Sequence, residues 1–118
     1  MEKITIYHNP RWGKSRESVK ILDEIQKEYK IIDYINNSPS KIELKSLAKK
    51  LGLRAKEFIR NKEVVFKELE LNKQIDNDDF LFEKMSQYPK LIERPIIVND
   101  ENAIIGRPPK KIYDFLKS

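Results

Sequence analysis

The order of apolar segments along the chain predicts an α/β fold, a small sheet with flanking helices and a helical insertion. A strand–helix–strand pattern opens the sequence, amphipathic helical patterns fill its middle, and a strand–strand–helix pattern closes it. With 118 residues the chain has the length of one domain, and its 39% of hydrophobic residues are enough for one core.

The opening pattern predicts two parallel strands. Residues 4–7 are apolar and β-branched, which is typical of a buried strand. A turn follows at residues 8–10, and residues 13–27 form a helical pattern with Val19, Leu22 and Ile25 on one face. Residues 30–34 read as a second strand. Strands so close in sequence and joined by a helix favour a parallel pair with a crossover connection.

The middle of the chain begins with a well-marked helix. Ser40 and Glu43 fit the capping box that starts many helices. An apolar stripe follows at i, i+3, i+4 and i+7, and Gly52 is placed to end the helix. The stripe consists of Leu44, Leu47, Ala48 and Leu51.

Three weaker helical patterns complete the insertion. One carries Phe58 and Ile59, and a short turn or helix is expected over residues 64–69. We expect Asp76 to cap a further helix that includes Phe80, Leu81 and Met85 and has Asp78 and Asp79 in its first turn. Phe80, Phe82 and Met85 are expected to pack in the core rather than to form a cofactor site.

The closing pattern predicts a hairpin and a final helix. Residues 96–98 and 103–105 read as strands joined by a turn at residues 100–102, and Gly106 ends the second strand. Pro108 and Pro109 are expected to start the last helix, whose inward face carries Ile112, Phe115 and Leu116.

This order of elements matches a thioredoxin-like, or glutaredoxin-like, architecture. We expect one domain over residues 1–118, with a core from about residues 1–35 and 91–118 and a helical insertion over about residues 36–90.

Composition excludes several kinds of chemistry. The chain has no Cys, which rules out disulfides, thiolate metal sites, iron–sulfur clusters and a thiol nucleophile of its own. The net charge of +5 comes mainly from Lys scattered among Asp and Glu, without a basic groove interleaved with aromatic residues, which argues against a nucleic-acid partner. No apolar run approaches the ~18 residues of a membrane span, and no leader pattern is seen, so we expect a cytoplasmic protein without a membrane partner.

The first strand–helix junction is a candidate anion site. Backbone N–H groups at a helix N-terminus favour negative charge, and Arg11, Lys14 and Arg16 add cations there. Arg94 and Arg107 each stand at a strand end beside a Pro. Arg is well suited to a tetrahedral oxyanion, because its fork of N–H donors matches two of the anion's oxygens. The alternative stays open that these residues only shape a turn and pair with the many carboxylates.

Three segments resemble the signatures of the glutaredoxin-coupled arsenate reductases. They are Tyr7-His8-Asn9-Pro10-Arg11-x-x-Lys14-Ser15-Arg16-Glu17, Leu91-Ile92-Glu93-Arg94-Pro95-Ile96 and Ile105-Gly106-Arg107-Pro108-Pro109. The likeness spans the whole chain. The regulator Spx is a more distant relative, which shares the Arg-Pro-Ile strand but opens with a Cys pair and lacks the Gly-Arg-Pro-Pro ending.

The resemblance implies how a site would be assembled. It implies a thioredoxin-like fold, a cis peptide before Pro95, and an oxyanion held by Arg60, Arg94 and Arg107. His8 and Ser15 match groups that tune the family's nucleophilic Cys. Glutathione and glutaredoxin would complete the reduction of arsenate to arsenite, so glutathione is the implied co-substrate and glutaredoxin the implied partner.

The chain departs from the family at the nucleophile itself, because Trp12 occupies that position. Indole cannot form the covalent adduct with arsenic, so no catalytic residue of the family mechanism is intact. The remaining candidates hold an oxyanion (Arg60, Arg94, Arg107) or line its site (His8, Arg11, Trp12, Ser15, Pro95), and none is a metal ligand. Trp12 either fills the pocket or turns outward.

Three functions stay open at this point. The first is a family member without redox activity that keeps an Arg-lined site for arsenate, phosphate or sulfate, with no bound cofactor. The second is a regulatory or protein-interaction module of the Spx type, with Trp12 as an aromatic anchor. The third is glutathione- and glutaredoxin-dependent arsenate reduction, with the thiol supplied externally or with Trp12 an error in the sequence.

Overall fold

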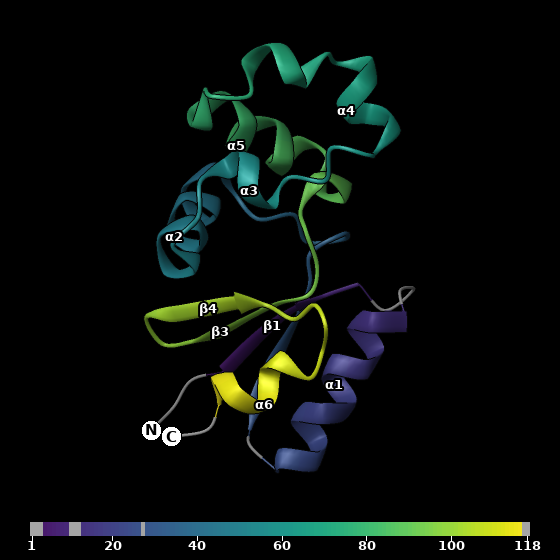
Figure 1. The fold of residues 1–118 in the computed structure, drawn as a ribbon, viewed down its shortest axis with the longest axis vertical. Coiled ribbons are helices and arrows are strands. Elements are labelled where there is room, and N and C mark those ends of the chain that lie inside the picture. The colour runs from purple at the N-terminus through teal and green to yellow at the C-terminus, as the bar shows by residue number, and fades with distance from the viewer. Residues whose placement is uncertain (1–3, 10–12, 27, 117–118) are drawn as a thin grey trace. The chain divides into compact units, whose positions relative to one another are not determined.

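One part of the chain is built around a mixed four-stranded sheet (Figure 1). The computed structural model describes residues 4–9, 13–26 and 28–116. Its strands are β1 (Ile4–His8), β2 (Tyr29–Asp33), β3 (Ile96–Asn99) and β4 (Asn102–Ile105), in the order β2-β1-β3-β4. The predicted parallel pairing of β1 with β2 is confirmed, and the other two pairings are antiparallel.

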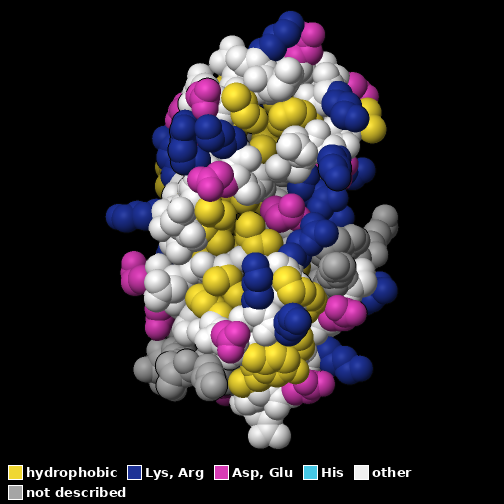
Figure 2. All heavy atoms as spheres, in the orientation of Figure 1, with side chains coloured by type: hydrophobic (Ala, Val, Ile, Leu, Met, Phe, Trp, Pro, Cys, Tyr) yellow, Lys and Arg dark blue, Asp and Glu magenta, His cyan; other side chains and the backbone are white. Residues whose placement is uncertain are grey.

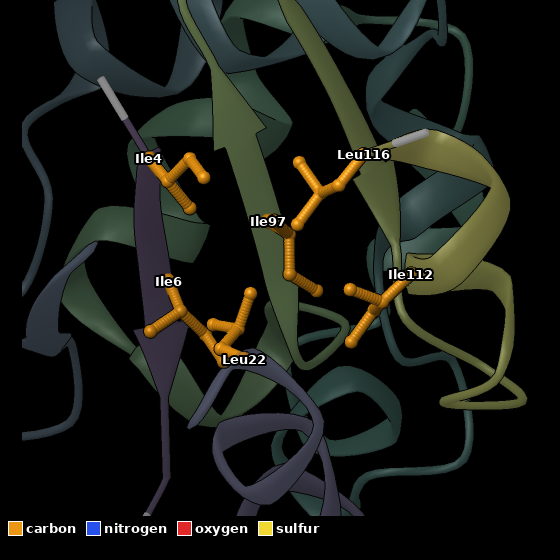
Figure 3. Close-up of a cluster of buried hydrophobic side chains, with 6 residues drawn as sticks. All are labelled: Ile4, Ile6, Leu22, Ile97, Ile112 and Leu116. Atoms are coloured by element: carbon orange, nitrogen blue, oxygen red, sulfur yellow. The ribbon is translucent and has the colours of Figure 1, made fainter. Parts of the chain in front are cut away.

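Two helices pack on one face of this sheet. They are α1 (Gly13–Ile25) and α6 (Lys111–Phe115). Figure 3 shows their apolar side chains meeting those of β1 and β3 in one buried cluster. The cluster contains Ile4, Ile6, Leu22, Ile97, Ile112 and Leu116. Burying this apolar surface anchors both helices to the sheet.

Two predicted boundaries near the C-terminus are wrong by a few residues. Asn102 opens β4, so the hairpin turn consists only of Asp100, which has a φ of 54°, and Glu101. The last helix begins at Lys111 and not at the proline pair. The N–H of Lys111 donates to the carbonyl of Pro108 at 3.0 Å, a three-residue turn that delays the helix.

The chain divides into two compact units, one drawn from residues 1–34 and 94–118 and the other from residues 35–93. The second unit contains α2 (Lys41–Leu51), α3 (Ala55–Phe58), α4 (Val64–Glu68), α5 (Asp78–Gln87) and the 3₁₀ turns η1 (Leu71–Gln74) and η2 (Pro89–Leu91). Its core is apolar, and the rings of Phe58 and Phe82 lie 6.2 Å apart.

The caps of α2 are as predicted. The Ser40 hydroxyl accepts from the N–H of Glu43 at 3.1 Å, and Gly52 ends the helix with a φ of 69°. That left-handed conformation favours a residue without a Cβ.

Two other predictions for this unit are wrong. Asn77, not Asp76, caps α5, because its side-chain oxygen accepts from the N–H of Phe80 at 3.1 Å. Asp76 instead pairs with Lys56 at 3.0 Å. Ile59 lies outside α3 in extended backbone, where it bridges to Ile92.

The surface carries charges of both signs. Figure 2 shows Lys and Arg side chains interspersed with Asp and Glu over the visible face. Among the described residues, no helix combines the length and the hydropathy that crossing a membrane requires.

Candidate functional site

Three segments of the predicted site meet at one end of the sheet. Tyr7 of β1 lies opposite Ile96 of β3, which lies opposite Ile105 of β4. His8 is the last residue of β1. It therefore lies at the same end of the sheet as residues 94–95, which precede β3, and residues 106–107, which follow β4. The sheet register brings the first, central and C-terminal signature segments together.

A close backbone contact joins two of these segments. The N–H of Gly106 donates to the carbonyl of Pro95 at 2.9 Å. A Cβ at position 106 would lie 2.8 Å from Cδ1 of Ile97 and 3.2 Å from Cγ of Pro95. Only glycine allows this approach without displacing a neighbour. The peptide bonds before Pro95, as expected, and before Pro108 are cis.

His8 is buried at this end of the sheet, with 7% of its surface exposed. Its Nδ1 is fully enclosed and has no hydrogen-bond partner among the described residues. Burial holds the pKa of the imidazole below its ordinary value; the Asp33 carboxylate opposes this shift, and Arg16 adds to it. The imidazole is therefore neutral near pH 7.

Ser15 links the end of β1 to the first turn of α1. Its side chain is fully buried, and its hydroxyl accepts from the N–H of Asn9 at 3.4 Å. This bond spans the segment that contains Arg11 and Trp12. Both of those predicted site residues lie outside the described residues, as does the side chain of Lys14.

The two arginines of the sheet end differ in exposure. Arg94 is 9% exposed, whereas Arg107 is half-buried. Burial strengthens the electrostatic attraction between a guanidinium and an anion, because less water screens it. The sheet end thus combines two arginines, a buried imidazole and the start of a 13-residue helix.

Arg60 belongs to the helical unit, where two carboxylates bind it. Its Nε lies 3.1 Å from Glu63 and its Nη1 lies 3.2 Å from Glu93. Its backbone N–H donates to the carbonyl of Leu91 at 2.7 Å. The sequence reasoning did not single out either carboxylate, although the i, i+3 spacing to Glu63 is a usable signal.

Two hollows lie apart from these residues. One, of about 370 Å³, lies against α1 and the start of α6, beside Ile21, Pro109 and Tyr113. The other, of about 760 Å³, is lined by Arg54 and residues 72–78. Neither is lined by a predicted site residue, whereas buried polar groups converge at the sheet end, which is typical of functional sites. In the described parts of the chain, no group of three or more His, Asp or Glu could hold a metal ion.

The sheet order and the two helices on one face define a thioredoxin-like α/β protein. The chain belongs to the ArsC family, whose model matches residues 7–115. The match covers all three signature segments.

Individual relatives agree with this assignment. The chain is 38% identical over 116 residues to the uncharacterized protein YfgD of Escherichia coli K12, covering 98% of each. It is 38% identical over 114 residues to an arsenate reductase of Haemophilus influenzae, covering 96% of this chain and 98% of the relative. The solved arsenate reductase from Vibrio cholerae superposes with a TM-score of 0.92 at 43% identity, covering 97% of this chain and 98% of that one.

Proposed function

We propose that this chain binds a tetrahedral oxyanion at the sheet end described above and performs no thiol redox chemistry of its own. The observation that carries the proposal is the convergence of Arg94 and Arg107 on one end of a sheet in a chain without Cys. The anion class is arsenate, phosphate or sulfate, because relatives are named arsenate reductases and these anions are all tetrahedral and negatively charged.

The chemistry of the residues supports binding. Guanidinium groups make short charge-assisted bonds to oxyanions, each contributing about 1.5–3 kcal/mol. The backbone N–H groups in the first turn of a helix such as α1 favour negative charge nearby. The family pattern matches a third guanidinium to Arg60 of the helical unit, and in this chain Glu63 and Glu93 bind that guanidinium.

Because the chain has no thiol, we expect it to bind the anion without reducing it. The family's nucleophile position holds Trp12 and the chain contains no Cys, so arsenate cannot be attached to a thiol of this chain. Any reduction would need a thiol from glutathione, with glutaredoxin as partner. Both are cytosolic reductants, so the cytoplasm is the expected compartment.

Calorimetric titration with arsenate, phosphate and sulfate tests the binding. We expect saturable binding by the wild type and binding at least about tenfold weaker in Arg94→Gln. Arg54→Gln is the matched control, since this exposed arginine pairs with Asp78 at 3.0 Å in the helical unit. Equal affinities in the wild type and Arg94→Gln would overturn the proposal.

A coupled arsenate reduction assay tests the second part of the proposal, that the chain performs no thiol redox chemistry of its own. With glutathione, glutaredoxin and NADPH we expect no turnover by the wild type and turnover by Trp12→Cys, because the substitution restores only the nucleophile. Arsenite formation by the wild type that depends on glutathione and Arg94 would favour the external-thiol hypothesis instead.

A further inference from the structure

The single His of the chain is placed where its charge state must matter to an anion. His8 ends β1, is buried, and has an enclosed Nδ1 without a hydrogen-bond partner among the described residues. The Ser15–Asn9 bond holds the residue after His8 against the first turn of α1. An enclosed ring nitrogen that lacks a partner is costly, and a bound acceptor or a nearby negative charge would relieve that cost.

Every element at this end of the sheet carries a charged residue at or next to the end that His8 occupies. Asp33 lies opposite it in the register of β2, and Arg16 lies on α1. Arg94 precedes β3 and Arg107 follows β4. Arg16 disfavours a positive charge on the imidazole, and Asp33 favours it.

We infer that binding of a divalent oxyanion at this end of the sheet is coupled to protonation of the His8 imidazole. One proton passes from solvent to a ring nitrogen, the neutral imidazole becomes imidazolium, and no other bond changes. The site then matches a dianion with three positive groups, Arg94, Arg107 and imidazolium, and discriminates against monoanions. This inference rests on the proposed function.

The sign of the pH dependence follows from linkage. Burial keeps the imidazole neutral near pH 7 in the free protein. A bound dianion stabilises the imidazolium and raises its pKa, so the protonated protein binds the anion more tightly. Affinity therefore rises as pH falls from above the pKa of the bound form to below the pKa of the free form.

The composition of the chain allows a pH-dependent affinity in this range to be assigned to His8. With one His and no Cys, His8 is the only side chain whose ordinary pKa lies between about pH 5 and 8. Sulfate is the suitable probe, because it stays a dianion throughout this range. Any change in its affinity then reports a protonation of the protein.

The first experiment is calorimetric titration of the full chain with sulfate at about pH 5.5, 6.5 and 7.5, in buffers of different ionisation enthalpy. An opposite charge within about 4–6 Å shifts a pKa by about 1–3 units, so we expect affinity about tenfold higher at the lowest pH, with proton uptake. His8→Gln is expected to bind without pH dependence. Sodium chloride at matched ionic strength is the control for screening.

A second experiment needs no variant. Proton NMR of the wild type resolves the imidazole C–H signals of one His, and we expect their titration midpoint to move to higher pH when sulfate is added and not when chloride is added. Sulfate binding without a shifted midpoint and without proton uptake overturns the coupling but leaves the proposed function standing. Absence of sulfate binding at every pH overturns both.

Discussion

The two units of the molecule bury different kinds of side chain. Among the described residues, all the buried polar or charged side chains belong to the unit that contains the sheet, namely His8, Ser15, Ser18 and Arg94. The helical unit buries apolar side chains and carries ion pairs at its surface, such as Lys45 with Asp79 at 2.8 Å. Burying polar groups costs stability, so their concentration at one sheet end is typical of a functional site.

The largest expected effect tests whether apolar packing holds the helical unit. Phe58 is 1% exposed and packs beside Phe82. Phe58→Ala should lower the free energy of unfolding by about 3–5 kcal/mol, because it removes buried surface and leaves a cavity. Urea denaturation measures this change. Tyr88→Ala, at an exposed aromatic of the same unit, is the control and should change stability little; similar losses in both variants would contradict this picture.

The next effect compares the arginines of the two units. Arg94→Gln should weaken sulfate binding by about 1.5–3 kcal/mol. Arg54→Gln, at an exposed arginine of the helical unit that pairs with Asp78 at 3.0 Å, should leave it unchanged. Parallel titrations of the two variants measure the difference. Equal losses of affinity in the two variants would contradict the comparison.

A smaller effect concerns the backbone contact at the sheet end. Gly106→Ala places a Cβ against Ile97 and Pro95 and should cost about 1–3 kcal/mol of stability through overpacking. Gly13→Ala is the matched control, since the nearest atom to its Cβ is the flexible end of Arg16 at 3.7 Å. Thermal denaturation compares the two. Equal denaturation midpoints would contradict the prediction and would show that Ile97 and Pro95 move aside at little cost.

The smallest effect tests the ion pairs at the surface of the helical unit. Hydrogen bonds from Lys41 and Lys45 hold the pKa of Asp79 below its ordinary 3.8. A carboxyl group whose pKa is lowered in the folded protein stabilises the fold at pH values above its ordinary pKa. This stabilisation is lost as the pH falls through the lowered pKa. Asp79→Asn should thus lower the denaturation midpoint slightly at pH 7 and not at strongly acidic pH. Because Asp79 is 57% exposed, salt should weaken the difference between the variant and the wild type. A large loss of stability at pH 7 would contradict the view that apolar packing, and not its surface ion pairs, holds the helical unit together.

Much of the fold could be predicted from local patterns. The parallel β1–β2 pair and both caps of α2 follow from segments a few residues long, and the structure confirms them. The errors are also local. Asn77 and Asp76 are both good caps, and only Asn77 has its side-chain oxygen placed to accept the N–H of Phe80. Likewise, the proline pair is compatible with a helix start, but the chain turns before α6 begins.

The sequence by itself determined the family signatures, the absence of a thiol and the positions of the arginines, because these depend only on residue identity and spacing. Only the folded structure shows which of those residues share a sheet end, that His8 is buried at the end of β1, and that Glu63 and Glu93 bind Arg60. Burial and charge pairing join residues tens of positions apart. Their energies depend on distance in space and on exclusion of water, which a local pattern does not encode.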